Sequence, residues 1–359
     1  MKPLVYAITG HGYGHGVRSC DLIHALCCRS PDLPIIIVSS LLESFLENRL
    51  EGFLDRLSFE PRSLDVGMVQ LDSVRVDLAA TEQALTRLCR DWEKLVRQET
   101  VFLEAVRACG VVADIPGIPL EAAARAGIPG IAVGNFGWDW IYRSVVRRDP
   151  VWQEAGYRYA EAYRGAKTLI RLPFHEPMSA FPSVVDSPLV SRRGTRQRAR
   201  LAALTGADPG KQWALLSFST LDWGEDAIRR VQSLPATECF TVKPLAFPGL
   251  RAVDRRDVSY TDVLASCDVV VTKPGYGVLS ECVVHDKPIL YVERTDFAEY
   301  PVLEASVRAH LRHVHLPAER LYQGELQAGL EAIAACPPPE VRLVSDEGDL
   351  AASEILAML

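Results

Sequence analysis

Residues 4–18 read LVYAITGHGYGHGVR, and this stretch decides how the rest of the chain is interpreted. The apolar run over residues 4–8 predicts a short buried strand, and residues 19–28 carry apolar side chains at helical spacing. The glycines between them allow a sharp turn and the close approach of a ligand, because no Cβ stands in the way. Two histidines and an arginine share this turn. We therefore interpret residues 9–18 as a candidate chemical centre that opens a βαβ unit.

The composition is that of a globular protein. The 359 residues are 48% hydrophobic and 24% charged, which suits two domains of ordinary size. A net charge of −7 argues against a nucleic-acid partner. Nine scattered cysteines predict neither a disulfide framework nor a zinc site. Without an apolar signal segment or an apolar run of roughly 18 residues, we expect a cytoplasmic protein with at most peripheral membrane association.

Apolar strands alternate with amphipathic helices along the whole chain, which predicts an α/β protein with two Rossmann-like, doubly wound domains. The strands expected in the first half, after residues 4–8, are residues 33–40, 111–116, 129–133 and 168–174, with a long helix at 81–108. Those expected in the second half are residues 213–220, 239–243, 268–272 and 288–292. Residues 175–188 contain several prolines and are interpreted as a linker. We predict an N-terminal domain at 1–178, a C-terminal domain at 179–345, and a final helix at 346–359 that returns to the first domain.

Ligands of such sheets collect outside the carboxyl ends of the strands. Residues 9–18, Asp114 and the segment after residue 133 are therefore expected to converge. That last segment, GNFGWDWIY at 134–142, carries four aromatic residues. Two interpretations stay open: core packing, or a wall for a sugar or acceptor built by Asn135, Trp138 and Asp139.

A second glycine turn lies at residues 273–281, KPGYGVLSE, and is followed by KPILYV at 287–292. This pair resembles the nucleotide-binding stretch of the GT-B glycosyltransferases. The resemblance implies a helix whose N-terminus faces a diphosphate, an arrangement that backbone N–H groups and the helix dipole favour physically. It also implies that Glu281 binds the ribose hydroxyls. Within residues 296–299, it implies that Glu299 lies near the donor sugar or nucleobase.

The opening turn resembles the glycine-rich loop of the peptidoglycan N-acetylglucosaminyltransferase, in which a histidine at the position of His15 closes the loop. It is more similar to the N-terminal, glycosyltransferase-like half of plant L-arabinokinase. Five blocks match that half in order: the glycine–histidine opening, residues 114–116, residues 135–139, residues 186–190, and the glycine turn followed by Ser-Glu. The ATP loop of the kinase half is not found in this sequence, so kinase activity is not implied.

The resemblance implies a hexosyl- or pentosyltransferase that uses a nucleotide sugar, UDP-linked by expectation, and an unidentified acceptor, which is a glycan, a lipid-linked sugar or a small molecule. Transfer is expected to be inverting and without a cofactor. No Asp-x-Asp motif is present, so metal-independent catalysis is predicted. Two alternatives stay open: a nucleotide-sugar 2-epimerase or hydrolase on the same scaffold, and a non-catalytic module that binds sugar nucleotides.

Three residues of the first domain are the candidates for acid–base chemistry. His15 is the leading candidate for a base or a phosphate contact, since histidine titrates near neutral pH, and His11 is its rival. Asp114 is either the base, the residue that orients a histidine, or a cap of the turn. Arg18 either meets a negatively charged ligand or pairs with an acid.

The remaining candidates are assigned to the nucleotide-sugar donor. Lysines and hydroxyls at strand ends are expected to bind phosphate in place of a metal. The donor set is Gly12, Gly14, Arg18, Ser217, Ser219, Lys243, Lys273, Gly275, Tyr276, Gly277, Ser280, Glu281 and Glu299. A dinucleotide site at residues 9–18 is disfavoured, because Ser39 and Ser40 stand where the ribose-binding acid is expected. The nucleotide is therefore predicted on the second domain, with residues 9–18 on the reaction side of a shared site.

Overall fold

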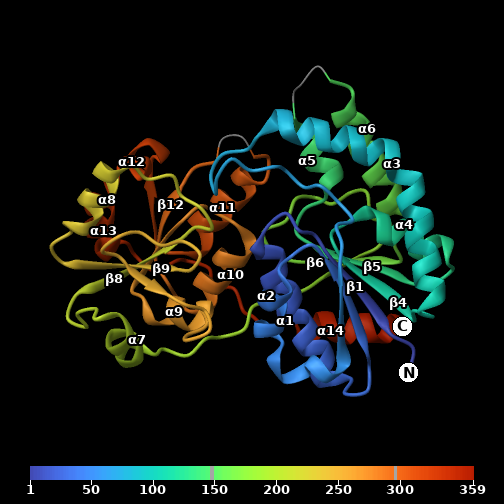
Figure 1. Cartoon of the computed structure of the whole chain (residues 1–359), viewed down its shortest axis with the longest axis horizontal. Helices are drawn as coiled ribbons and strands as arrows, with labels where there is room; N and C mark the ends of the chain where they lie inside the picture. The colour runs from blue at the N-terminus through green and yellow to red at the C-terminus, as the bar shows by residue number, and fades with distance from the viewer. Residues whose placement is uncertain (146–148, 295–296) are drawn as a thin grey trace. The chain divides into compact units, whose positions relative to one another are not determined.

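The chain forms two compact α/β units in the computed structural model (Figure 1). The structure describes residues 1–145, 149–294 and 297–359. Unit 1 consists of residues Met1–Val69, Asp77–Ser191 and Ser345–Leu359. Unit 2 consists of residues Gln70–Val76 and Arg192–Val344. The chain therefore passes between the units four times, and a short early segment belongs to the second unit.

Unit 1 is built on a sheet that has, within its described residues, seven parallel strands in the order β3-β2-β1-β4-β5-β6-β7. The strands are β1 Leu4–Ile8, β2 Ile35–Ser39, β3 Leu57–Pro61, β4 Gly110–Asp114, β5 Gly130–Gly134, β6 Thr168–Arg171 and β7 Val184–Asp186. Every residue of β1, β4 and β5 is buried, as expected for central parallel strands covered on both faces. Their carboxyl ends lie side by side, with Ile8 in register with Asp114.

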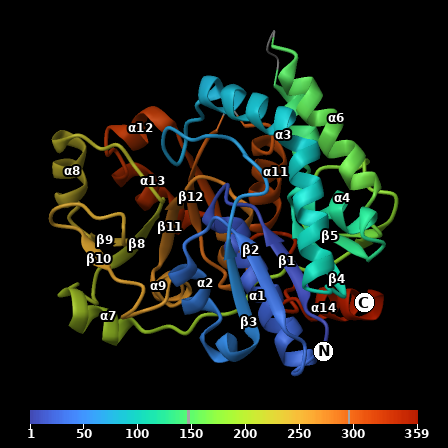
Figure 2. The same cartoon turned by 45° about the vertical axis from the view of Figure 1, so that its right-hand side comes forward.

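The helices of unit 1 gather in two groups (Figure 2). Helices α3, α4 and α6 pack against one another, and the C-terminal helix α14 packs against α1. The helices are α1 Tyr13–Arg29, α2 Glu43–Arg49, α3 Leu78–Ala105, α4 Gly117–Arg125, α5 Trp138–Ser144, α6 Val151–Arg164 and α14 Asp349–Met358, with a 3-10 turn at Glu51–Arg56. Arg29 fixes α14 through two hydrogen bonds to Asp349, of 2.6 and 2.5 Å. The predicted return of the last helix to the first domain is confirmed.

Unit 2 repeats this plan with six parallel strands among its described residues, in the order β10-β9-β8-β11-β12-β13. The strands are β8 Gln212–Ser217, β9 Thr237–Val242, β10 Arg251–Val253, β11 Val269–Thr272, β12 Ile289–Val292 and β13 His313–Leu316. The helices are α7 Arg198–Thr205, α8 Glu225–Gln232, α9 Tyr260–Ser266, α10 Tyr276–Val284, α11 Tyr300–His310, α12 Ala318–Tyr322 and α13 Gln327–Ala332, with a 3-10 turn at Ile333–Ala335. The predicted class, two doubly wound α/β halves, is confirmed.

Two local predictions were wrong. The helix after β1 begins at Tyr13 rather than at residue 19, so His15 and Arg18 lie on the helix and not in a loop. Gly16 fits there because α1 and α2 pack closely: a Cβ at this position would lie 2.6 Å from Phe45. Residues 175–188, interpreted as a linker, contain β7, a strand of three residues that is too short to show a periodic pattern.

The compact units divide the chain at residues 191/192 and 344/345, whereas the sequence-based boundaries were 178/179 and 345/346. The first division comes later because β7 pairs in parallel with β6, with Leu169 opposite Val184. Within the described part of the chain, none of the helices has the length and apolar character that crossing a membrane requires.

Candidate functional site

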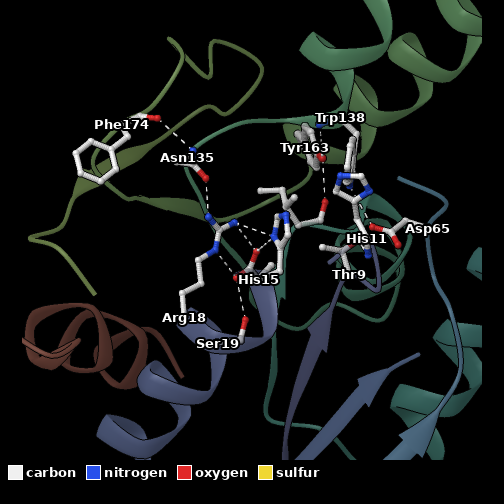
Figure 3. A network of polar contacts seen from close by, with 12 residues as sticks. Thr9, His11, His15, Arg18, Ser19, Asp65, Asn135, Trp138, Tyr163 and Phe174 are labelled. Carbon is white, nitrogen blue, oxygen red and sulfur yellow. Dashed lines mark hydrogen bonds and ion pairs between the residues drawn. The ribbon is translucent and has the colours of Figure 1, made fainter. Parts of the chain in front are cut away.

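A buried polar network lies at the carboxyl ends of β1, β4 and β5 in unit 1 (Figure 3). Its centre is Asp114, the last residue of β4, which is fully buried. His15 Nδ1 lies 2.8 Å from Asp114 Oδ1, and Ser19 Oγ donates to Oδ2 at 2.8 Å. His15 and Ser19 are four residues apart on α1, so both point to the same side of the helix. Because α1 already begins at Tyr13, the side chains of His15 and Ser19 lie on the helix and contact Asp114 at the end of β4.

Arg18 holds the carboxylate of Asp114 from the same helix. Its Nε and one terminal nitrogen donate to the two carboxylate oxygens at 2.7 and 2.6 Å. Its other terminal nitrogen donates to Asn135 Oδ1 at 2.5 Å, and Asn135 Nδ2 donates to the carbonyl of Phe174 at 3.1 Å. Arg18 is only 2% exposed. Of the two interpretations, the structural ion pair describes Arg18, and a direct contact with the donor does not.

The charge of Asp114 is stabilised by these neighbours. Burial alone would raise the pKa of this carboxyl, but the positive charge of Arg18, with His15, outweighs burial and holds the pKa well below its usual range. Asp114 is therefore a permanent anion near neutral pH. It is a residue that orients His15, and it is a poor proton acceptor.

The proton on the His15 ring is assigned by this geometry. A nitrogen 2.8 Å from a carboxylate oxygen must carry hydrogen, so Nδ1 donates to Asp114. The 3.0 Å approach of Arg18 to the same nitrogen needs no hydrogen bond, because Asp114 and Asn135 already accept from the guanidinium. When the ring is neutral, Nε2 carries the lone pair, and none of the described residues forms a hydrogen bond with it. His15 thus has the form of a general base.

His11 has the opposite tautomer. Its Nδ1 accepts the backbone N–H of Met68 at 3.1 Å, so the neutral ring carries its proton on Nε2. Gly67, at φ +65°, allows this approach, because a Cβ there would lie 2.7 Å from His11. The ring stands edge-on to Trp138 at 5.0 Å. His11 therefore suits the role of hydrogen-bond donor to an anion better than that of base.

Asp65 is a member of this region that sequence reasoning missed. It lies in the loop after β3 and is 8% exposed. Its Oδ2 accepts the indole N–H of Trp138 at 3.1 Å. Burial raises the pKa of Asp65, although hydrogen bonds from Thr9 and Trp138 and the nearby His15 oppose the rise. The loop after β3 has no periodic or glycine-rich signal that would have singled out this residue.

The three residues proposed as an acceptor wall belong to the interior of unit 1. Trp138 is fully buried and stacks on Tyr142 with ring centroids 5.5 Å apart. Asp139 is 4% exposed and pairs with Arg143 at 2.5 Å. Asn135 accepts a hydrogen bond from Arg18. Core packing is thus the interpretation that fits these residues, and an acceptor surface built directly by their side chains does not.

In unit 2, the second glycine turn leads into helix α10 after β11. Gly275 is the N-cap residue, and a Cβ added there would meet nothing within 4 Å. The first backbone N–H groups of α10 have no partner within the helix, and the dipole favours an anion at this end. The helix begins at Tyr276, so Gly277 lies inside its first turn rather than before it. Phosphate binding at this end of α10 stays a prediction, and the open helix N-terminus is compatible with it.

Two predicted donor residues on α10 point into the protein. Ser280 is 1% exposed and donates to the carbonyl of Tyr276 at 2.8 Å. Glu281 is 2% exposed, and its Oε1 accepts the hydroxyl of Thr261 at 3.0 Å. Contact between the carboxylate of Glu281 and a ribose is thus a proposal that requires this side chain to leave Thr261.

The other predicted donor residues are spread over the unit. Ser217 ends β8, and its Oγ lies 2.5 Å from the hydroxyl of Tyr260. Lys243 Nζ lies 3.8 Å from Asp254, and Lys273 lies half-buried between β11 and α10. Glu299 is buried directly before α11, and Asp296 of the same motif lies outside the described residues. Of the two glycines assigned in the first unit, Gly12 caps α1 and Gly14 lies inside it.

Comparisons with known proteins agree with the fold. No protein-family model matches the chain. It is 30% identical over 350 residues to L-arabinokinase of Arabidopsis thaliana, a match that covers 94% of this chain and 33% of that protein. The chain thus spans about a third of the curated relative.

Solved structures match over nearly the whole chain. Arabidopsis thaliana UGT89C1 complexed with UDP superimposes with a TM-score of 0.64 at 14% identity, covering 99% of each chain. The calicheamicin glycosyltransferase CalG4 superimposes with a TM-score of 0.62 at 15% identity, and the match covers 100% of this chain and 98% of CalG4. The spinosyn rhamnosyltransferase SpnG complexed with thymidine diphosphate superimposes with a TM-score of 0.57 at 14% identity, and the match covers 99% of this chain and 95% of SpnG. The chain therefore has the fold of the GT-B glycosyltransferases.

Proposed function

We propose that the chain is a glycosyltransferase that moves a sugar from a UDP-linked donor to the hydroxyl group of an acceptor. The fold supports this proposal, as do similar proteins whose structures contain UDP or thymidine diphosphate. The single observation that carries it is the pairing of His15 with Asp114 at 2.8 Å, which leaves Nε2 as the proton acceptor. A fold alone does not define a reaction, so the proposal rests on this oriented histidine.

The proposed reaction inverts the anomeric carbon. The acceptor hydroxyl gives its proton to His15 Nε2 while its oxygen attacks that carbon. The bond from the sugar to the diphosphate breaks, and the electron pair leaves on the diphosphate oxygen. Asp114 keeps the ring oriented through Nδ1–H and stabilises the imidazolium that forms.

The leaving diphosphate needs positive charge or hydrogen-bond donors. We propose that the N-terminal N–H groups of α10, beside Gly275, supply these donors. Because a helix N-terminus then does the work often done by a divalent ion, activity is expected to persist in a chelator. Loss of activity in EDTA that magnesium restores would contradict this part.

A second candidate, a non-catalytic module that binds sugar nucleotides, is favoured by one observation. Arg18 occupies both oxygens of Asp114, so the network is satisfied internally, as a purely structural network would be. The module requires only the α10 site in unit 2. The two candidates therefore differ in whether bound donor is ever consumed.

The test is a panel of UDP-, TDP- and GDP-sugars, with binding followed by calorimetry and products by NMR, with and without an acceptor mixture. Transfer to an acceptor with release of UDP supports the proposal. Release of free sugar or inversion at C2 without an acceptor identifies a hydrolase or 2-epimerase. Tight donor binding with no product under any condition identifies the module.

A further inference from the structure

Arginines are concentrated at the start of the main part of unit 2. Residues 192–204 carry five arginines and no acidic residue, in a chain whose net charge is −7. One of the five is structural, because Arg198 lies 4.0 Å from the ring centre of Trp213 and donates to Asp268 at 2.8 Å. Three others have exposed side chains, namely Arg193, Arg196 and Arg200. Within the described part of the chain, none of these three forms an ion pair with an acid, so their charges face solvent.

This stretch lies at the amino ends of the strands of unit 2. The N–H of Gln197 donates to Ser266 Oγ at 2.7 Å, and Ser266 ends the helix that leads into β11. The N–H of Gly194 donates to His285 Nε2 at 2.8 Å, and His285 lies in the turn that leads into β12. The amino ends of parallel strands share one edge of the sheet. Gly275, at the start of α10, lies at the opposite edge, where β11 ends.

The turn before β12 brings further cations to this edge. The carboxylate of Asp286 lies 3.7 Å from the guanidinium of Arg312 and 3.8 Å from that of Arg342. Burial lowers the pKa of Lys287 in the same turn, and the nearby positive charge of Arg196 adds to this decrease. The two groups of cations therefore belong to one cluster.

The acids that contact this cluster do not neutralise it. Asp268 pairs with Arg198, and Asp262 accepts the N–H of Thr195 at 2.6 Å. Asp286 is shared by two arginines. Positive charge is therefore in excess here, although the chain as a whole is negative. We call the outward-facing members of the cluster the basic edge: Arg193, Arg196, Arg200, Arg312 and Arg342.

Exposed apolar side chains lie among these arginines. Leu204 is 53% exposed, and it follows Arg200 by four residues on α7, so the two share one side of the helix. Val341 and Val344 flank Arg342 in the chain, and Val344 is 76% exposed. Apolar side chains that stand singly among cations do not form the contiguous core of a protein interface of about 1,000 Å². They suit a lipid surface, which such side chains enter one by one.

We propose that the basic edge of unit 2 is a docking surface for a membrane that contains anionic phospholipids. Its arginines bind the headgroup phosphates, with which a guanidinium forms paired hydrogen bonds. Leu204 and Val344 enter the apolar border beneath the headgroups. Because this edge of the sheet faces the lipid, the opposite edge with Gly275 stays accessible. The proposal does not depend on the proposed function.

The test is sedimentation of the full chain with vesicles of phosphatidylcholine alone, and with vesicles in which phosphatidylglycerol replaces part of it. We expect binding to the second kind only, weakening as salt is raised, because salt screens the attraction. Arg342→Glu is expected to weaken this binding about fivefold or more, since each arginine near an anionic surface adds to the attraction. The matched control is Arg229→Glu on α8, which changes the net charge equally and whose side chain is 63% exposed, against 67% for Arg342.

The apolar contact is tested by Val344→Ser. This change is expected to weaken binding to the acidic vesicles about threefold, because part of one apolar contact with the acyl chains is lost. Val101→Ser is its control, since Val101 is also exposed but lies on α3 in unit 1. Equal effects of the two serine substitutions would contradict the insertion of Val344.

Binding to neither kind of vesicle, equal binding to both, or equal weakening by Arg342→Glu and Arg229→Glu would overturn the proposal. Binding to soluble polyglutamate without binding to vesicles would identify an acidic protein as the partner, and would overturn it too. Thermal unfolding is measured for every variant. If Arg342→Glu is unstable, Arg193→Glu takes its place and is expected to cause the same loss of binding.

Discussion

The two units use a helix N-terminus in opposite ways. In each, a glycine caps the N-terminus of a helix that follows a central strand, and a Cβ at Gly12 or Gly275 would meet nothing within 4 Å. In unit 1 the first turns of that helix carry buried, charged side chains that bind Asp114. In unit 2 the first turn of α10 carries no acidic residue, and the glycine leaves open space.

The two arrangements suit two different tasks, orienting a proton acceptor in unit 1 and binding an anion in unit 2. A buried network of side chains holds one proton acceptor in one orientation, at the cost of burying charge. An open helix N-terminus receives a negatively charged group through the backbone and needs no side chain to do so. We expect substitutions in unit 1 to affect stability and rate, and those at α10 to affect affinity.

The largest effect on stability is expected for Asp114→Asn. This change leaves the guanidinium of Arg18 buried without its carboxylate, and breaking such a pair costs about 3–5 kcal/mol. Urea unfolding measures the loss. The matched control is Asp186→Asn, which removes the exposed two-fold contact with Arg171 and should cost less than about 1 kcal/mol. Equal losses of unfolding free energy in the two variants would mean that the buried pair stabilises the protein no more than the exposed one.

An intermediate effect, dependent on pH, is expected at Glu176 in the loop after β6. Its two oxygens accept the N–H groups of Gly137, at 3.3 Å, and Met178, at 2.7 Å. Burial, with the neighbouring charge of Asp139, raises the pKa of Glu176 to about 7 in spite of these bonds. The folded protein therefore holds this proton at a pH where the unfolded chain has lost it.

The direction of the pH dependence follows from this difference in protons bound by the folded and the unfolded protein. Between about pH 4.3, the ordinary value for glutamate, and about pH 7, the native state binds more protons, so stability falls as pH rises. Relative to Glu176→Gln, the wild type should lose about 1–3 kcal/mol between pH 5 and pH 8. Glu340→Gln, at an exposed position, is the control. A difference that does not change with pH would contradict the assignment.

The smallest effect is expected for Gly275→Ala. The backbone there is extended, at φ −161° and ψ 145°, and the new methyl group touches no protein atom. Alanine is a poorer N-cap than glycine, so the free energy of unfolding should fall by no more than about 1 kcal/mol. The methyl group does occupy the approach to the N-terminus of α10. We expect UDP to bind about tenfold more weakly, or about 1.4 kcal/mol, by calorimetry.

Gly12→Ala is the matched control, because its methyl group is equally free of contacts in unit 1. It should leave UDP affinity unchanged. If the alanine at residue 12 weakened UDP binding and the alanine at residue 275 did not, the assignment of the nucleotide to unit 2 would be reversed.

The central strands of both sheets were predictable from sequence, because central parallel strands are continuous apolar runs. The edge strands were not predicted: β3, β7, β10 and β13 are partly exposed and short, so they form no such run. The convergence of His15, Asp114 and Asn135 was predictable too, since the carboxyl ends of parallel strands share one edge of the sheet. The role of Arg18 was not. A cation beside a glycine turn has the same appearance in sequence whether it meets a ligand or a buried acid.

Other features had no local signal at all. Asp65 lies in a loop whose sequence shows no periodicity. Trp138, which donates a hydrogen bond to it, is 73 positions away in the chain. Residues 70–76 belong to unit 2, where Ser73 accepts the N–H groups of Ser219 and Thr220, almost 150 positions later in the chain. Such contacts depend on how distant segments pack, and a single sequence does not record that. Burial of Ser280 and Glu281 was likewise set by packing, although their motif suggested ligand contacts.

The most direct test of the central claim is His15→Ala, with turnover of a UDP-sugar and the Kd for UDP measured on the same preparation. We expect kcat to fall by about 10²–10⁴, because the proposed base is lost. We expect the Kd for UDP to stay within about twofold of the wild type, because the proposed nucleotide site lies in unit 2. Unchanged turnover, or a loss of UDP binding that explains the whole defect, would contradict the role of His15 as the base.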